Sequence, residues 1–152
     1  MNYWMLVSSP ANFETSRARG FDLAGMKSRH RKKAEKVQAG DRVLFYLTGV
    51  QSFGGTATAT GPFFESQEPI WTSKKETEDY PFRFPIQPDA ILAADGLVRA
   101  EDLLPALEWV KKWPASHWQL AFQGNVHLLP AHDFATIEAA VRAAAPVSAS
   151  AG

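Results

Sequence analysis

The sequence contains no cysteine, so disulfides, thiolate nucleophiles and cysteine zinc sites are all excluded. This absence is compatible with a reducing compartment. The sequence also has no stretch of about 18 uncharged apolar residues, the length that a membrane-spanning helix needs. Asn12, Glu14 and Arg17 interrupt the region where a secretion signal would need an apolar segment. We therefore expect a cytoplasmic protein that does not associate with membranes.

The common catalytic motifs are also missing. Neither the G-x-S-x-G motif of hydrolases nor the H-E-x-x-H motif of zinc proteases occurs. Residues 49–56 have the glycine spacing of a phosphate-binding loop, but Gly55 stands where that loop requires a lysine. The spacing of His117, His127 and His132 does not place two imidazoles on one helical face. We expect no metal, no cofactor and no catalytic residue.

Positive charge is concentrated in one short segment. Residues 27–36 hold six of the 16 Lys and Arg side chains and one carboxylate, Glu35, so this segment carries about +5. The chain has a net charge of zero, so its other residues carry about −5. A solvated helix face would explain such a run. The asymmetry is also typical of a surface that binds a polyanion, and nucleic acid is the first candidate.

The hydrophobic pattern, with 45% apolar and 12% aromatic residues, predicts one α+β domain over residues 1–145, followed by a flexible Ala/Ser tail at 146–152. We expect strands at residues 3–7, 42–47, 56–61 and 80–86. The second and third of these should pair as a hairpin. Pro81 and Pro85 place the fourth near a sheet edge or after a bulge.

Helices are expected from capping residues and from apolar residues at helical spacing. They are predicted at residues 11–19, in the basic segment with Ala34 and Val37 facing inward, at 101–113, and around Phe134, Ile137 and Val141. Residues 21–24 are expected in an ordered loop. Residues 118–122 and 126–129 would form a short hairpin or an irregular return.

Several short features occur in an order that resembles the EVE domain. They are Tyr3-Trp4 and Ser9-Pro10 around the first strand, Gly25 before the basic segment, Gly40-Asp41 before Phe45-Tyr46, the segment Tyr80 to Pro88, and Trp118, Phe122, Gly124 and Leu129-Pro130. The resemblance covers nearly all of residues 2–142. EVE domains belong to the PUA-like superfamily, with the YTH and ASCH domains as relatives. The resemblance implies a small mixed β-barrel of about five to six strands with helices packed around it.

The resemblance also implies a function. Small EVE proteins look like readers of modified bases in DNA or RNA, in which one base leaves its strand and enters a concave pocket. Such a pocket needs aromatic faces for stacking, polar groups that read the base edge and a basic rim for phosphates. We therefore expect a non-enzymatic nucleic-acid-binding module whose partner is DNA or RNA.

By this resemblance, the base pocket would be formed by Ser9, Phe21, Leu23, Gly25, Met26, Thr48 and Trp71. The hydroxyls of Ser9 and Thr48 would face a base, although both residues are also common where strands end. Trp71 matches a cage tryptophan, and an indole in a charged loop has little core to join. EVE relatives often have a tryptophan where this chain has Phe21 and Leu23, so this wall of the pocket differs.

The basic rim would bind phosphates through Lys27, Arg29, His30, Arg31, Lys32 and Lys33, with His30 at the pocket mouth. The other four tryptophans, Trp4, Trp109, Trp113 and Trp118, are expected in the core. Two other functions stay open. One is a small enzyme acting on a nucleoside or base, with Glu76, Glu78 or His30 as acid or base. The other is a protein-interaction module whose basic face binds an acidic partner.

Overall fold

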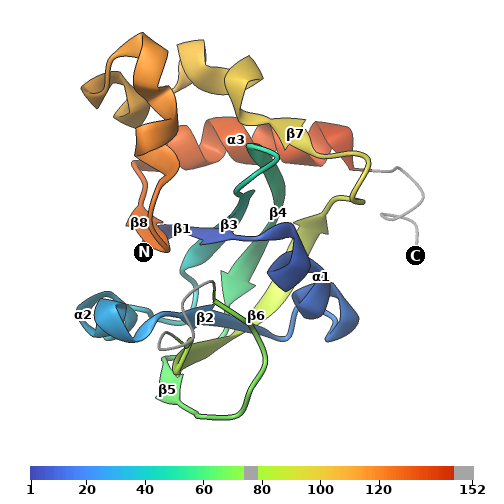
Figure 1. Ribbon diagram of the computed structural model, residues 1–152, viewed down its shortest axis with the longest axis vertical. Coiled ribbons are helices and arrows are strands. Elements are labelled where there is room, and N and C mark those ends of the chain that lie inside the picture. Colours follow the sequence, from blue (N-terminus) through green and yellow to red (C-terminus); the bar gives the residue numbers. More distant parts are fainter. Residues whose placement is uncertain (74–78, 146–152) are drawn as a thin grey trace.

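The computed structural model describes residues 1–73 and 79–145, which form a curved mixed sheet with helices on both sides (Figure 1). Its strands are β1 (Tyr3–Ser8), β2 (Leu23–Met26), β3 (Arg42–Leu47), β4 (Ser52–Ala59), β5 (Phe64–Glu65), β6 (Phe82–Ile91), β7 (Val98–Arg99) and β8 (Val126–Leu128). Their order is β2-β6-β4-β3-β1-β8, while β5 pairs with β6 and β7 pairs with β4. The α+β prediction is confirmed. The described residues form an open half-barrel with eight strands instead of about five or six.

β3 and β4 form the predicted hairpin. Their turn contains Gly49 with φ of 86° and Gln51 with φ of 49°, the left-handed backbone that a tight turn requires. β4 begins at Ser52, earlier than the alternating pattern predicted, because Ser52, Phe53 and Gly55 pair with β3. β1 runs parallel to β3, so the carboxyl ends of these two strands meet at one edge of the sheet. This edge positions the candidate site.

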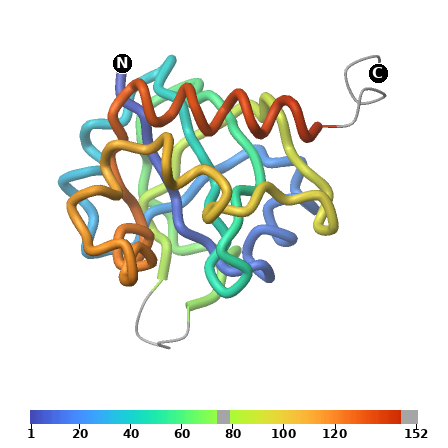
Figure 2. Tube along the Cα trace, turned by 90° about the horizontal axis from the view of Figure 1, so that it is seen from above, coloured from blue at the N-terminus to red at the C-terminus, as the bar shows by residue number. Residues whose placement is uncertain are grey.

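The sheet is buried on both faces because alternate residues of its central strands enter two hydrophobic clusters. In β1, Trp4 and Leu6 lie in the first cluster and Met5 lies in the second. The second cluster is covered by α3 (Ala131–Ala144), the predicted last helix, which crosses above the strands in Figure 2. Full burial of one large apolar side chain contributes about 1.5–3 kcal/mol, so the two clusters hold the strand register firmly.

Helix α1 (Pro10–Ala18) begins where β1 ends. The Ser9 Oγ accepts a hydrogen bond from the Asn12 N–H at 3.1 Å and caps the helix, and Pro10 occupies its first turn, where no N–H donor is needed. The basic segment that follows β2 is helical only in the short elements η1 (Ser28–His30) and α2 (Arg31–Ala34). Ala34 and Val37 are buried there, as predicted.

Two predictions about the sheet are corrected. Leu23–Met26 is a strand and not a loop, because it pairs with β6 in register from Leu23 opposite Pro85 to Met26 opposite Phe82. β6 is not an edge strand, since it lies between β2 and β4. Its ladder with β4 is interrupted by a bulge next to Pro88, which is how the sheet accommodates a residue that lacks an N–H donor.

The predicted helix at 101–113 is also corrected, and of the two alternatives for residues 118–122 the irregular return is found and the hairpin strand is not. The structure instead has three 3₁₀ helices, η2 (Ala100–Ala106), η3 (Trp109–Lys112) and η4 (Ala115–Phe122). Pro105 lies inside η2, where its missing N–H prevents a regular α-helix. Asp133 of α3 is fully buried and accepts hydrogen bonds from the backbone N–H groups of Glu108 and Trp109, which fixes η3 to α3.

In the described part of the chain, no helix is both long enough and apolar enough to cross a membrane. Trp4 and Trp109 are buried as predicted, whereas Trp113 and Trp118 are only half-buried. The predicted Ala/Ser tail at 146–152 lies outside the described residues.

Candidate functional site

A cleft of about 690 Å³ opens where β1 and β3 end. The two strands are joined there by a hydrogen bond from the Thr48 N–H to the Ser8 carbonyl, at 2.9 Å. The cleft is lined by Val7, Ser8, Ser9, Asn12, Lys27, Arg29, Tyr46, Thr48, Gly49, Gln51, Thr72, Ser73, Tyr80, Gln119, Phe122, Gln123, Gly124 and Asn125. Ser9 and Thr48, the two hydroxyl residues predicted to face a pocket, therefore line one cleft together with Lys27 and Arg29 of the basic segment.

A second, smaller cavity of about 30 Å³ lies beside the cleft. This recess shares with the cleft the residues Val7, Ser8, Asn12, Tyr80 and Asn125. Trp71 and Gly25, both predicted as pocket residues, line the recess and not the cleft. The recess has room for about one or two water molecules and is too small for a base.

The indole of Trp71 is held in place on several sides. Its Nε1 donates a hydrogen bond to the Ser16 Oγ at 2.9 Å, and its ring lies edge-on to Tyr80 with 5.9 Å between centroids. The guanidinium carbon of Arg83 lies 5.5 Å from the ring centre. Gly25 leaves room for the indole, because a Cβ at that position would lie 2.5 Å from the Trp71 Cζ3.

Aromatic side chains form one wall of the cleft. Tyr46 of β3 stacks on Phe122 of η4 with 4.4 Å between ring centroids and 25° between their planes. Trp109 and Trp118 meet the same phenyl ring edge-on, so Phe122 is fixed from three sides. Burial raises the pKa of Tyr46 to about 12, and its hydroxyl therefore keeps its proton at neutral pH. It can donate a hydrogen bond as well as accept one.

Two asparagines line both cavities, and the sequence pattern did not single out either of them as a site residue. Asn12 is buried and exchanges two hydrogen bonds with the backbone of Thr72. Asn125 is buried directly before β8, and its Oδ1 accepts a hydrogen bond from the Lys27 N–H at 2.9 Å. An asparagine near a helix start and one in a Gly-Asn turn are ordinary in sequence. Their burial between distant segments is visible only in three dimensions.

The basic segment does not present one uniform face to the cleft. Lys27 and Arg29 line it. Arg31 instead pairs with Glu35 at 3.2 Å and with Glu65 of β5 at 3.6 Å. Lys33 donates from its Nζ to the Val126 carbonyl of β8 at 3.0 Å.

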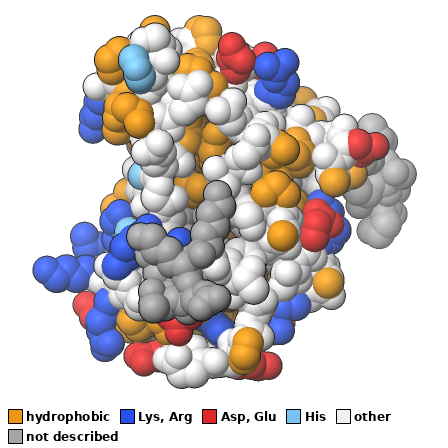
Figure 3. All heavy atoms as spheres, viewed as in Figure 1, with side chains coloured by type: hydrophobic (Ala, Val, Ile, Leu, Met, Phe, Trp, Pro, Cys, Tyr) orange, Lys and Arg blue, Asp and Glu red, His pale blue; other side chains and the backbone are white. Residues whose placement is uncertain are grey.

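Lys32 is exposed on α2 and is not among the cleft residues. Burial and the charges of Lys36 and Arg29 lower the pKa of Lys33. Figure 3 shows Lys and Arg side chains gathered on the side of the molecule where α2 lies.

His30 is part of this segment but lines neither cavity. Burial, together with the charges of Lys33 and Arg29, lowers its pKa from 6.5 to about 4. The imidazole is therefore uncharged at neutral pH, and His30 does not add a positive charge to a phosphate-binding rim. Its Nε2 accepts a hydrogen bond from the Arg29 Nε at 3.2 Å.

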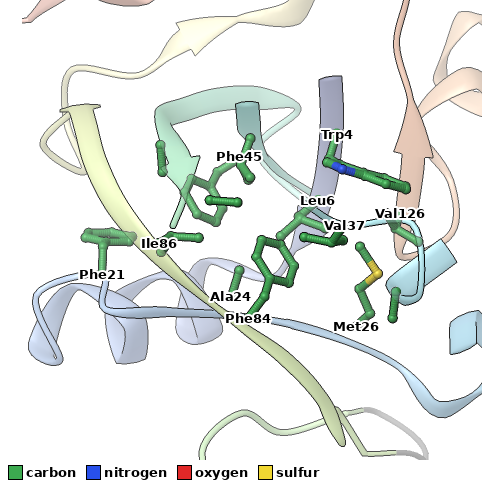
Figure 4. Packing of buried hydrophobic residues seen from close by; sticks show 14 of the residues in the cluster. Trp4, Leu6, Phe21, Ala24, Met26, Val37, Phe45, Phe84, Ile86 and Val126 are labelled. Carbon is green, nitrogen blue, oxygen red and sulfur yellow. The ribbon is translucent and has the colours of Figure 1, made fainter. Parts of the chain in front are cut away.

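Three predicted pocket residues line neither cavity. Phe21 is buried in the first cluster, with its ring 5.1 Å from that of Phe13 and 5.7 Å from that of Phe45 (Figure 4). Met26 is fully buried in the same cluster, because it points to the opposite side of β2 from Gly25. Leu23 is half-buried and pairs with Pro85.

Glu76 and Glu78, considered as acid or base residues, lie outside the described residues. Among the residues that the structure describes, no three His, Asp or Glu side chains come together in a way that could hold a metal ion.

Comparisons with known proteins agree with this fold. The family model described as EVE domain matches residues 2–140. A UPF0310 protein from Pyrococcus abyssi is 26% identical over 148 residues, which cover 91% of this chain and 98% of that protein. The solved structure of Rpa0253 from Rhodopseudomonas palustris gives a TM-score of 0.58 at 16% identity and covers 94% of both chains.

YTH domains have a similar fold. The Mmi1 YTH domain gives a TM-score of 0.69 at 7% identity, covering 95% of this chain and 97% of that one. A complex of the YTH domain-containing protein mmi1 with RNA gives a TM-score of 0.67 at 7% identity and covers 94% of this chain and 82% of that one.

Proposed function

Because the chain belongs to the EVE domain family, we propose that it binds nucleic acid and holds one extruded, chemically modified base in the cleft between β1, β3 and η4. The domain acts as a non-enzymatic reader of DNA or RNA. The observation that carries this proposal is the composition of the cleft, which brings aromatic rings, hydroxyl and amide groups and two cationic side chains together in one cavity.

The size of the cleft suits a nucleotide. Pockets for small molecules usually have volumes of about 300–1,000 Å³, and the cleft has about 690 Å³. A base with its sugar fits within this volume, whereas the neighbouring recess does not admit even the base. The base therefore enters the cleft, and Trp71 supports the wall between the cleft and the recess.

The chemistry of the lining matches the three requirements of base reading. Tyr46, Tyr80 and Phe122 provide aromatic surface, and stacking of a base on such rings contributes about 1–3 kcal/mol. Thr48 provides a hydroxyl on an exposed turn that can hydrogen-bond the edge of a base. Lys27 and Arg29 lie where phosphates of the bound strand would pass, and they would add affinity without base selectivity.

The structural neighbours support a nucleic-acid ligand. The YTH domain-containing protein mmi1 has been solved in complex with RNA, and its fold matches 94% of this chain. A domain with this overall fold can therefore bind RNA. The basic segment beside the cleft, with its charge of about +5, adds the electrostatic attraction that a polyanion requires.

Titration of the purified protein with fluorescent oligonucleotides tests this proposal. Matched DNA and RNA strands, each unmodified or with one modified base, are compared by anisotropy at low and at moderate salt. We expect at least one modified strand to bind about tenfold more tightly than its unmodified counterpart, with an affinity that falls as salt rises. Absence of binding, or equal affinity for all strands whatever their modification, would contradict the proposal. Turnover of free nucleosides would favour an enzyme instead.

A further inference from the structure

Asn125 connects three segments of the chain at the rim of the cleft. Its backbone carbonyl accepts a hydrogen bond from the Val7 N–H of β1 at 2.8 Å. Its side-chain Oδ1 accepts one from the Lys27 N–H, which follows β2, at 2.9 Å. Only 3% of the residue is exposed, and it lines both the cleft and the recess.

The Lys27 contact fixes the orientation of the Asn125 amide. A flip of the side chain would bring Nδ2–H against the Lys27 N–H, so that two donors would face each other. Oδ1 therefore stays toward Lys27 and Nδ2 stays on the other side. Within the described residues, Nδ2 donates a hydrogen bond to no protein group. It is also not sealed from solvent. Since the residue lines both cavities, Nδ2 is a locked donor that faces their space.

We propose that Asn125 determines which base the cleft accepts, by offering a hydrogen-bond donor that cannot turn into an acceptor. The inference rests on the proposed function and deepens it. The favoured base presents an unprotonated ring nitrogen or a carbonyl oxygen toward β8. A base that presents an N–H or amino group there is rejected, because two donors would face each other and the amide cannot rotate to relieve the clash.

The ligand supplies the first half of the test. The strand that the wild type binds best is prepared with analogues of its recognised base, in which one ring nitrogen is replaced by C–H or one carbonyl oxygen by sulfur. One such replacement should weaken binding by the wild type about tenfold, because it removes the acceptor that Nδ2 contacts. If the wild type tolerates every replacement equally, Asn125 does not read the base.

The protein supplies the second half. Asn125→Asp keeps the acceptor for Lys27 and converts the donor into an acceptor with nearly unchanged shape. Gln123→Glu is the matched control, because it adds the same charge at an exposed cleft residue two positions away. We expect Asn125→Asp to bind the preferred strand at least about tenfold more weakly than Gln123→Glu does, and to lose its sensitivity to the critical analogue.

The outcomes separate this inference from the proposed function. If the wild type reads a modified base but the two variants have equal affinities, the role of Asn125 is overturned while the proposed function stands. If the wild type binds no oligonucleotide, both are overturned. Should Asn125→Asp fail to fold, the analogue series on the wild type still decides, because a base read without any dependence on its acceptors contradicts the inference.

Discussion

The side chain of Asn12 and the backbone of Thr72 form a closed pair of hydrogen bonds across 60 positions of sequence. The Asn12 Nδ2 donates to the Thr72 carbonyl at 2.7 Å, and the Thr72 N–H donates to the Asn12 Oδ1 at 3.0 Å. This pair fastens the first turn of α1 to the segment that carries Trp71. It thereby joins two sides of the recess, and both residues also line the cleft.

Asn12→Asp should therefore destabilise the fold. The substitution removes the donor to the Thr72 carbonyl and places two oxygens against each other, so we expect the free energy of unfolding to fall by about 1–3 kcal/mol. Urea denaturation at pH 7 measures this change. Gln87→Glu, the same amide-to-acid change at an exposed position of β6, should stay within about 0.5 kcal/mol of the wild type. Equal effects of the two substitutions would show that the hydrogen-bonded pair contributes nothing specific.

Gly25→Ala should disturb Trp71. The new Cβ would lie 2.5 Å from the indole Cζ3, so either the ring or β2 must move, and we expect a loss of about 1–3 kcal/mol in the free energy of unfolding. Gly96→Ala is the control, because its Cβ would meet no atom closer than 3.8 Å. Trp71→Phe should lower the free energy of unfolding less in the Gly25→Ala background than in the wild type, because the smaller ring relieves the clash. If the effects of Gly25→Ala and Trp71→Phe on the free energy of unfolding simply add, the two residues are not in contact.

Asp41→Asn tests a buried carboxylate at the start of β3. Asp41 accepts hydrogen bonds from the backbone and side chain of Asn2, from the Trp4 Nε1 and from the Gln38 N–H. An amide would turn one acceptor into a donor that faces other donors. We therefore expect the free energy of unfolding at pH 7, measured by urea denaturation, to fall by about 2–3 kcal/mol.

The same residue gives a pH dependence. Burial raises the pKa of Asp41, but the hydrogen bonds from Asn2, Trp4 and Gln38 outweigh it and lower the pKa below 3.8. The stabilisation by the charged form is therefore fully present above pH 3.8 and is lost as the pH falls through the lower folded-state value. The difference in the free energy of unfolding between the wild type and Asp41→Asn should therefore shrink as the pH falls below 3.8. If this difference in the free energy of unfolding stays constant down to about pH 3, the charged form of Asp41 is not what stabilises the fold.

Lys27→Gln should weaken nucleic-acid binding without changing base preference. The Lys27 Nζ lies 5.7 Å from the Tyr80 ring centre at the cleft, and loss of one phosphate contact should lower the slope of log affinity against log salt by about 0.7–0.9. Anisotropy titrations at several salt concentrations give this slope. Lys111→Gln on η3, outside the cleft lining, should leave the slope unchanged. Equal slopes for the two variants would remove Lys27 from the strand-binding surface.

Much of the fold could be predicted from local sequence signals. β3 and α3 have strong β-branched or helical patterns, and both were found at nearly the correct positions. β2 was missed, because Leu-Ala-Gly-Met has little intrinsic strand preference and becomes a strand only by pairing with β6. The apolar spacing at 101–113 is helical, but Pro105 removes a donor that an α-helix needs, and three short 3₁₀ helices result.

The candidate site could be predicted only in part. The family resemblance alone led to Ser9 and Thr48. The structure brings them to one cleft because they follow two parallel strands, whose ends meet at one sheet edge. Phe21 and Met26 line neither cavity and are buried in the first cluster, because Met26 faces the opposite side of β2 from Gly25 and Phe21, which precedes β2, packs against Phe13 and Phe45. Asn125 reaches the cleft through a contact with Lys27, 98 positions away, which no local pattern records.

The central claim is that the cleft at the ends of β1 and β3 holds the base, and a pair of turn variants tests it most directly. Thr48 and Val50 are both exposed on the β3–β4 turn, but only Thr48 lines the cleft. Thr48→Trp should fill the cleft and weaken binding of the preferred modified strand at least about tenfold, whereas Val50→Trp should bind like the wild type. If the two variants bind that strand equally well, the base does not occupy this cleft.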